Sequence, residues 1–343
     1  MESADKVFRI ATVTTPAASA RPSLIRFISP GLTGYYDVPT MRSRRRPRTM
    51  AALIILARTE IMNKTTFLTA LFFGTFGSRM AAQGDSVWRS WNQPITPFHV
   101  IGNVYYVGAS DVTAFLIATS GGLILLDGGF VETAPQILRN IRTLGFDSRD
   151  VQIILNSHAH FDHAGGLAAL KAATRAQLYA GRGDSALLAR GGTGDFFFGD
   201  RLPYPPVTVD HATQDGDHVI LGTDTLVAIA TPGHTRGCTT WAMTVHDHGT
   251  AYATLFFCSF SIPGYRVRDH PPYPGITEDY QRSIRRLQAL RCDVFLAPHG
   301  SHFALLAKAA RARAALKSQF IDPDGCRAYL EGAAEALAAA MNR

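Results

Sequence analysis

Residues 151–166 read VQIILNSHAHFDHAGG, and this stretch decides the fold of the chain. Its first part, Val151 to Leu155, is a short continuous apolar run that predicts a buried strand. A turn between a strand and a helix lets nearby side chains converge in a way that a regular helix or strand does not. Neutral imidazole and carboxylate oxygen are ligands that suit zinc. The stretch therefore predicts a metal site at a strand end, built from His158, His160, Asp162 and His163.

Two later segments follow the same pattern of a buried strand and then a histidine. The run Leu226 to Ala230 leads into TPGHTRG, which places His234 at a strand end. The run Val294 to Ala297 leads into Pro298 and His299. Three strand ends are thus expected to bring six ligands into one cleft.

The rest of the body alternates short strand patterns with helical ones. Further strands are expected at 104–107, 114–118, 123–126, 177–180, 218–221, 241–245 and 252–257, and helices at 134–144, 166–173, 278–290 and 326–341. Thr277 is a plausible N-cap of the third helix. The Gly-, Pro- and Phe-rich residues 181–206 read as a long loop of the kind that is usually functional or mobile. Strands with interleaved helices over about 250 residues fit one layered α/β domain.

The charge of the chain is concentrated at its N-terminal end. Of its 343 residues, 46% are hydrophobic and 18% charged, with a net charge of +7. Residues 1–61 hold ten basic and four acidic side chains, whereas residues 83–343 hold 22 basic and 23 acidic ones. The body is globular in composition and near neutral, which argues against a nucleic-acid partner.

The N-terminal residues read as an export signal preceded by a leader. From Met62, a short positive region, an apolar run at 67–76 and a small-residue cleavage site follow in the order that a secretory signal requires. The apolar run is too short to span a bilayer. We expect residues 62–82 to be a signal peptide, 83–343 a single catalytic domain, and 1–61 an over-extended start. A twin-arginine signal around Arg44 to Arg46 is the alternative.

The order HxHxDH, then PGHT, then a strand-end histidine resembles the metallo-β-lactamase superfamily over about residues 95–305. The resemblance implies an alpha-beta-beta-alpha sandwich of two mixed sheets with helices on the outer faces. It implies two zinc ions per chain, the first held by His158, His160 and His234, the second by Asp162, His163 and His299. Glyoxalase II and lactonases carry a bridging aspartate where this chain reads FCSFS at 257–261. Subclass B3 is therefore the branch that this sequence most resembles.

This resemblance implies hydrolysis of the β-lactam amide by a metal-bound hydroxide, and hence antibiotic resistance. Asp162 would bind metal and orient the water, while Ser259 and Ser261 would hold the substrate carboxylate. Asp127, at a strand end, would support the ligand turn. The expected protein is a periplasmic monomer with a small-molecule substrate and no stable membrane insertion. A lactonase or thioester hydrolase of the same fold is the alternative.

The four cysteines form no CxxC pair. Cys292 and Cys326 match the positions of a disulfide in subclass B3 enzymes, and that bridge is expected. Cys238 is expected to be a free thiol in the core or beside the ligands. Cys258 is placed in the core, although a shift of register by one residue would make it a zinc ligand.

Overall fold

Two β-sheets form the centre of the described residues, 87–312 and 318–342 of the computed structural model. The first sheet has seven strands in sequence order, and the second has five in the order β12-β11-β10-β9-β8. The first comprises β1 (Phe98–Ile101), β2 (Val104–Tyr106), β3 (Phe115–Thr119), β4 (Gly122–Leu126), β5 (Val151–Leu155), β6 (Gln177–Gly181) and β7 (His211–Thr213). The second comprises β8 (His218–Leu221), β9 (Asp224–Ala230), β10 (Thr239–Asp247), β11 (Thr250–Phe256) and β12 (Val294–Leu296).

Both sheets mix strand directions. Strands β1 to β4 pair antiparallel, whereas β4 to β7 pair parallel. In the second sheet, the last strand, β12, pairs parallel to β11 and the others pair antiparallel. Parallel neighbours need long crossovers, and those after β4, β5, β6 and β11 each carry at least one helix.

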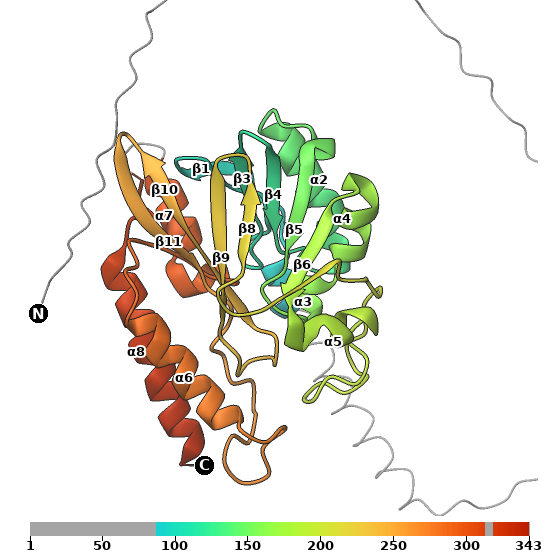
Figure 1. Ribbon diagram of the computed structural model, residues 1–343, viewed down its shortest axis with the longest axis vertical. Helices are drawn as coiled ribbons and strands as arrows, with labels where there is room; N and C mark the ends of the chain where they lie inside the picture. The colour runs from blue at the N-terminus through green and yellow to red at the C-terminus, as the bar shows by residue number, and fades with distance from the viewer. Residues whose placement is uncertain (1–86, 313–317, 343) are drawn as a thin grey trace, which may run out of the picture. The chain divides into compact units, whose positions relative to one another are not determined.

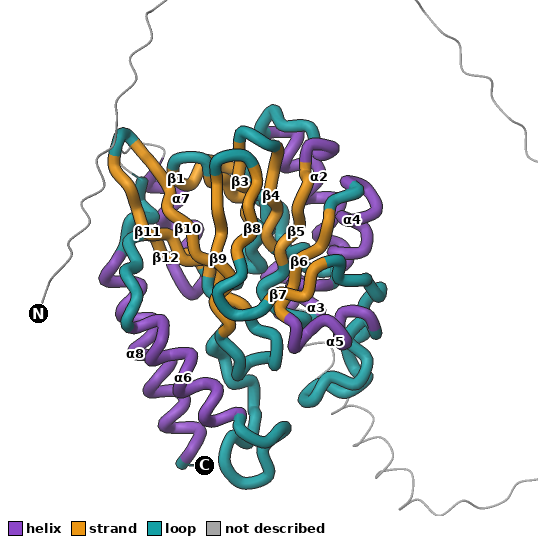
Figure 2. The backbone as a smooth tube through the Cα atoms, viewed as in Figure 1, coloured by secondary structure: helices purple, strands orange, loops and turns teal. Residues whose placement is uncertain are grey.

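Helices cover the outer face of each sheet, as Figures 1 and 2 show. Helices α2 and α4 lie beside the first sheet, and α6 and α8 lie on the opposite side of the molecule. The helices are α2 (Ala134–Thr143), α3 (Phe161–Ala164), α4 (Leu167–Thr174), α5 (Ser185–Ala189), α6 (Ile276–Gln288), α7 (Leu305–Ala312) and α8 (Pro323–Met341), preceded by a helical segment at 87–91. Short 3-10 turns lie at Val131–Thr133, Ser148–Asp150, Arg182–Asp184 and Gly300–Phe303. The architecture is the expected alpha-beta-beta-alpha sandwich.

Alternation along β4 explains why its sequence is apolar throughout. Ile124 and Leu126 belong to the core between the two sheets, where Trp241 and Phe256 of the second sheet meet them. Leu125 points to the other face and packs with the core of α2 and α4. A strand covered on both faces reads as a continuous apolar run rather than an alternating one. The same reasoning applies to β5, whose end carries the first candidate ligands.

Three expectations about local structure need correction. The loop expected at 181–206 contains a 3-10 turn and α5 before it becomes irregular. Thr277 is not the N-cap of α6, because the helix begins at Ile276 and Gly275 occupies the cap with a left-handed φ of 87°. The Thr277 hydroxyl instead donates to the carbonyl of Val267. The short strands β1 and β7 were not expected from the sequence.

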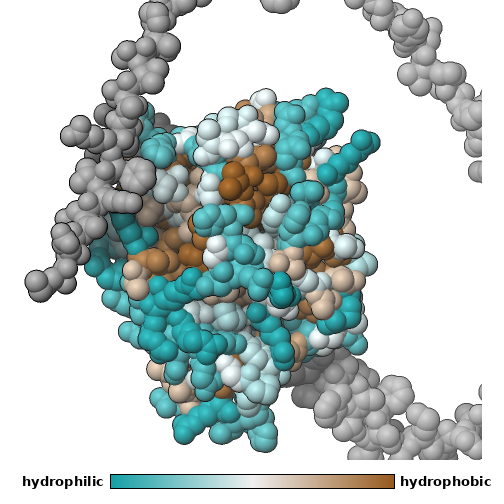
Figure 3. All heavy atoms as spheres, in the orientation of Figure 1, coloured by the Kyte–Doolittle hydropathy of each residue, from teal (hydrophilic) through white to brown (hydrophobic). Residues whose placement is uncertain are grey.

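The expected leader and signal peptide, residues 1–61 and 62–82, lie outside the described residues. Within the described part of the chain, no helix has the length and apolar character needed to cross a membrane. On the face drawn in Figure 3, apolar side chains gather only in separate patches among hydrophilic ones.

Candidate metal centre

The turn after β5 is held in place by Asp127 at the end of β4. The Asp127 carboxylate accepts hydrogen bonds from the Ser157 backbone N–H at 2.7 Å, the Ser157 hydroxyl at 2.6 Å and the Asn156 amide at 3.0 Å. Asp127 is buried and has a left-handed φ of 65°, which is uncommon for a residue with a side chain. This support was expected, and it fixes the backbone from which His158 and His160 extend.

Two other loops bring the remaining histidines to this turn. His234 lies between β9 and β10, and His299 follows β12. Both loops come from the second sheet, whereas the β5 turn comes from the first. The structure therefore brings together all six side chains that the sequence singled out, across the junction of the two sheets.

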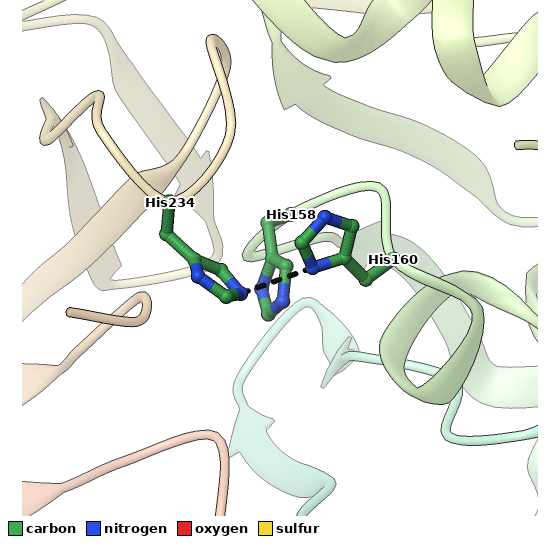
Figure 4. A group of neighbouring side chains, drawn as sticks. All are labelled: His158, His160 and His234. Atoms are coloured by element: carbon green, nitrogen blue, oxygen red, sulfur yellow. Dashed lines mark hydrogen bonds between the residues drawn. The ribbon is translucent and has the colours of Figure 1, made fainter. Parts of the chain in front are cut away.

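His158, His160 and His234 form one group that could hold a metal ion. Figure 4 shows the three rings facing one another, with His160 Nδ1 lying 3.0 Å from His234 Nε2. All three side chains are at least 95% buried. The ring nitrogens, rather than the ring carbons, converge on one point, as binding of a shared metal ion requires.

Asp162, His163 and His299 form a second convergence of donor atoms. His163 Nε2 lies 3.3 Å from His299 Nε2, and Asp162 Oδ2 lies 3.4 Å from each of these nitrogens. Ligand atoms bound tetrahedrally to zinc at about 2.05 Å are about 3.3 Å apart. This triangle therefore has the size of one face of a zinc coordination sphere. The His158 and His163 rings are 4.4 Å apart, so the two groups adjoin.

Each of the five histidines directs its other ring nitrogen at a protein oxygen. The pairs are His158 Nδ1 with Ser157 Oγ at 3.0 Å, His160 Nε2 with Asp195 Oδ2 at 3.6 Å, His163 Nδ1 with Asp127 Oδ2 at 3.8 Å, His234 Nδ1 with the Ser261 carbonyl at 2.8 Å, and His299 Nδ1 with Asp111 Oδ2 at 2.9 Å. The contacts of His158, His234 and His299 are hydrogen bonds, whereas those of His160 and His163 are longer. Metal-binding histidines characteristically direct their second N–H at such an oxygen, which fixes the tautomer and leaves the inner nitrogen bare. The donor set fits a divalent metal ion.

The pKa shifts keep three of the candidate ligands, His158, His234 and Asp162, in the charge state that binds metal, whereas His299 carries a proton. Burial and the neighbouring histidines hold the pKa values of His158 and His234 well below the usual range, so both rings are neutral at pH 7. Burial would raise the pKa of Asp162, but His163 and His299 outweigh that effect and hold it well below its usual value. Burial lowers the pKa of His299, yet Asp111 and Asp162 raise it to about 9. A metal ion must displace that proton to bind His299.

The two serines expected to hold substrate lie beside His234. Ser259 Oγ is 3.0 Å from Ser261 Oγ, which in turn lies 3.3 Å from His234 Nδ1. Ser259 is buried, whereas Ser261 is exposed. Ser261 is therefore the one of the pair that a molecule in solution can reach.

The cysteines correct one expectation and confirm another. Cys292 and Cys326 form the expected disulfide. Cys238 is not a free thiol, and Cys258 is neither free nor a metal ligand, because the two form a second disulfide with a Cα–Cα distance of 5.8 Å. Their pairing follows from strand register: Trp241 lies opposite Phe256 across β10 and β11, so the residues just beyond these strand ends also meet.

Aromatic side chains surround the convergent donors. Phe161 packs against Trp88 and Phe198 at centroid distances of 5.2 and 5.9 Å, and Phe198 also lies 5.1 Å from the His160 ring. Trp91 lies 5.0 Å from the His299 ring. Low-polarity surroundings strengthen electrostatic interactions at a site.

Sequence reasoning missed three carboxylates that support the site. Asp111 accepts from His299, Asp195 faces His160, and Asp184 accepts from the Ala159 and Gly237 backbones and the Thr235 hydroxyl. Each stands in the sequence without a neighbouring motif. Asp184 and Asp195 lie within residues 181–206, which the sequence marked as a loop, but only the fold shows which of its side chains reach the ligand loops.

Comparison with known protein families agrees with this geometry. Residues 107–299 match the family model described as the metallo-beta-lactamase superfamily. The chain belongs to the metallo-β-lactamase superfamily. It is a hydrolase of that superfamily, with side chains suited to a divalent metal ion.

Solved structures and curated relatives point to different branches of the superfamily. BJP-1, a subclass B3 metallo-β-lactamase of Bradyrhizobium japonicum, is 39% identical, with a TM-score of 0.70 over 74% of this chain and 96% of that one. A hydroxyacylglutathione hydrolase of Fuscovulum blasticum is 34% identical over 37% of this chain and 41% of its own length. An N-acyl homoserine lactonase of Rhizobium radiobacter is 24% identical over 52% of this chain and 76% of its own. This chain thus spans less than half of the hydroxyacylglutathione hydrolase but nearly all of the B3 enzyme.

Proposed function

We propose that this protein is an exported, zinc-dependent β-lactamase of subclass B3 that opens the amide of a β-lactam ring. The observation that carries the proposal is the combination of two adjoining three-residue donor groups with serines, rather than a carboxylate, at residues 259 and 261. A bridging aspartate, which lactonases and glyoxalase II carry, is replaced here by the segment from Phe257 to Ser261. The extended similarity to a B3 enzyme supports the same branch.

In this proposal the six convergent side chains hold two zinc ions. His158, His160 and His234 hold the first, and Asp162, His163 and His299 hold the second. Zinc held by these residues would supply a water with a pKa near 7 and would polarise the carbonyl of the substrate. Orientation of the water and binding of the substrate are assigned to the protein's own side chains.

Asp162 has two tasks in the proposed reaction. Its Oδ2 faces His163 and His299, which leaves Oδ1 to accept a hydrogen bond from the attacking water. A low pKa keeps this carboxylate ionised throughout the working range. Its position then orients the water toward the amide carbon, which is the main contribution of a fixed catalytic group.

The substrate carboxylate is assigned to the serine side of the cleft. Ser261 is exposed beside His234, and its hydroxyl can donate to an anion. Ser259 holds the Ser261 hydroxyl and accepts from the Ser261 backbone N–H, so it fixes the direction of that donor.

Hydrolysis of a lactone or thioester is the second candidate, because the curated relatives carry such names.

The two disulfides favour folding in an oxidising compartment and so support export to the periplasm. The antibiotic-resistance role and the monomeric state belong to the β-lactamase proposal.

The test is hydrolysis of a chromogenic cephalosporin and of a carbapenem by the purified protein, before and after chelation. Turnover that disappears with the chelator and returns with zinc would support the proposal. His234→Ala should lose turnover by at least 10³-fold and retain about one zinc fewer by elemental analysis. A protein that holds about two zinc ions but turns over neither substrate would move the function to a lactone or thioester.

A further inference from the structure

Asp195 organises the aromatic loop that borders the candidate metal centre. One carboxylate oxygen, Oδ1, accepts the backbone N–H groups of Phe197 at 2.7 Å and Phe198 at 2.6 Å. The backbones of Asp195 and Gly199 also exchange hydrogen bonds at 3.3 and 2.9 Å, which closes the loop. A short side chain that accepts from residues two and three positions ahead is a common device for stabilising a tight turn.

The second oxygen of the same carboxylate faces the metal centre. Asp195 Oδ2 lies 3.6 Å from Nε2 of His160, and among the described residues neither of these buried atoms has a hydrogen-bond partner. His160 Nδ1 points at His234, so Nε2 must carry the proton whenever Nδ1 binds a metal. A buried N–H without an acceptor is unfavourable, so a small approach of the carboxylate stabilises the contact.

A ring contact joins the same two elements. Phe198, whose backbone N–H is held by Asp195, packs edge-on against His160 at 5.1 Å and against Phe161 at 5.9 Å. The loop therefore contacts His160 twice, through the carboxylate and through the aromatic ring. Displacement of the loop would remove both contacts from this histidine.

We propose that Asp195 is a positioning residue that couples the aromatic loop at 195–199 to the metal ligand His160. Metal binding at Nδ1 fixes the His160 proton on Nε2 and strengthens the contact with Asp195, which holds the loop against His160. Because coupling between two equilibria is reciprocal, a loop held against His160 must also strengthen metal binding. The inference rests on the metal site of the proposed function but not on the identity of its substrate.

Asp195→Asn separates the two roles of the carboxylate. The asparagine oxygen can still accept from Phe197 and Phe198, which leaves its NH2 group facing the His160 N–H, donor against donor. Zinc affinity should fall about 10–100-fold, the usual effect of removing such an outer partner. Competition with a chromogenic chelator measures this affinity without any substrate, so the result is independent of β-lactam turnover.

Asp200→Ala is the matched control, because Asp200 supports the same loop without contacting His160. Its Oδ1 accepts from the Gly194 backbone at 2.9 Å, and the side chain is exposed. This variant removes one exposed hydrogen bond beside the loop and leaves the Asp195 carboxylate against His160, so zinc affinity should change by less than about 3-fold, a factor well below that expected for loss of an outer partner. Equal zinc affinity in Asp195→Asn and the wild type would overturn the proposal.

Hydrogen exchange of the wild-type protein tests the coupling even if Asp195→Asn folds poorly. Adding zinc to the metal-free protein should slow exchange of the Phe197 and Phe198 amides by about 10-fold or more, the equivalent of roughly 1.4 kcal/mol. Amides in α2, which is remote from the loop, serve as the internal reference. Unchanged exchange at residues 197 and 198 on zinc binding would contradict the coupling.

Discussion

Replacing Asp184 with alanine should loosen the connection between two of the loops that carry candidate ligands. Asp184 is only 2% exposed, and its carboxylate accepts from the Ala159 N–H at 3.0 Å, the Gly237 N–H at 2.8 Å and the Thr235 hydroxyl at 2.7 Å. Ala159 lies between two ligands of the β5 turn, and Thr235 follows His234. One side chain thus fastens the first-sheet turn to the second-sheet loop.

The magnitude follows from the groups that lose a partner. Each buried N–H left unpaired costs about 1–3 kcal/mol, and Asp184→Ala leaves two of them. Relief from burying a carboxylate offsets part of this, because burial raises the pKa of Asp184. We expect a net loss of about 3 kcal/mol in the free energy of unfolding, or about 6–12 °C in Tm for a domain of this size.

Urea unfolding in the presence of a chelator measures this loss without a contribution from bound metal. Zinc affinity of the folded variant should also fall by about 10–100-fold. Thr235→Val is the control, since it removes one partner and leaves both backbone groups paired, at a cost of about 1 kcal/mol. If Asp184→Ala cost no more than Thr235→Val, the carboxylate would not fasten the two loops and the reasoning would fail.

Three further predictions concern substrate binding, the disulfides and the last helix. Ser261→Ala should raise KM for a cephalosporin about 10-fold with little change in kcat, as loss of a hydrogen bond to a charged group implies; an unchanged KM would remove Ser261 from carboxylate binding. Replacing Cys292 and Cys326, which are 34 residues apart, by serine should cost about 4 kcal/mol in urea unfolding, and a cost below about 1 kcal/mol would contradict this. Asp322→Ala should cost about 3 kcal/mol, because it uncaps α8 and leaves the buried Lys308 ammonium unpaired; Lys308→Met should cost much less, and equal losses would argue against an unpaired charge as the cause.

The sequence predicted the elements whose signal is local. Continuous apolar runs identified β4 and β5, because both faces of these strands are covered. The six candidate ligands were found because each follows such a run within a few residues. The structure brings them together at the distances that a metal requires, while their assignment as zinc ligands stays a prediction.

Features that depend on contacts between distant segments could not be predicted. The Cys238–Cys258 bridge depends on the register of β10 and β11, which the residue types alone do not specify. Asp184 contacts a turn 25 residues before it and a loop 53 residues after it. Strands β1 and β7 are short, at four and three residues, and too short to show a reliable period.

The order in which the donors appear along the chain affects when the protein can acquire metal. His160 and His234 are 74 residues apart, and His163 and His299 are 136 apart. The second donor group is complete only after β12, the last strand of the second sheet, has joined its neighbour. A partly synthesised or partly folded chain therefore lacks part of the second donor group. Metal loading would then depend on the supply in the compartment where the chain finishes folding.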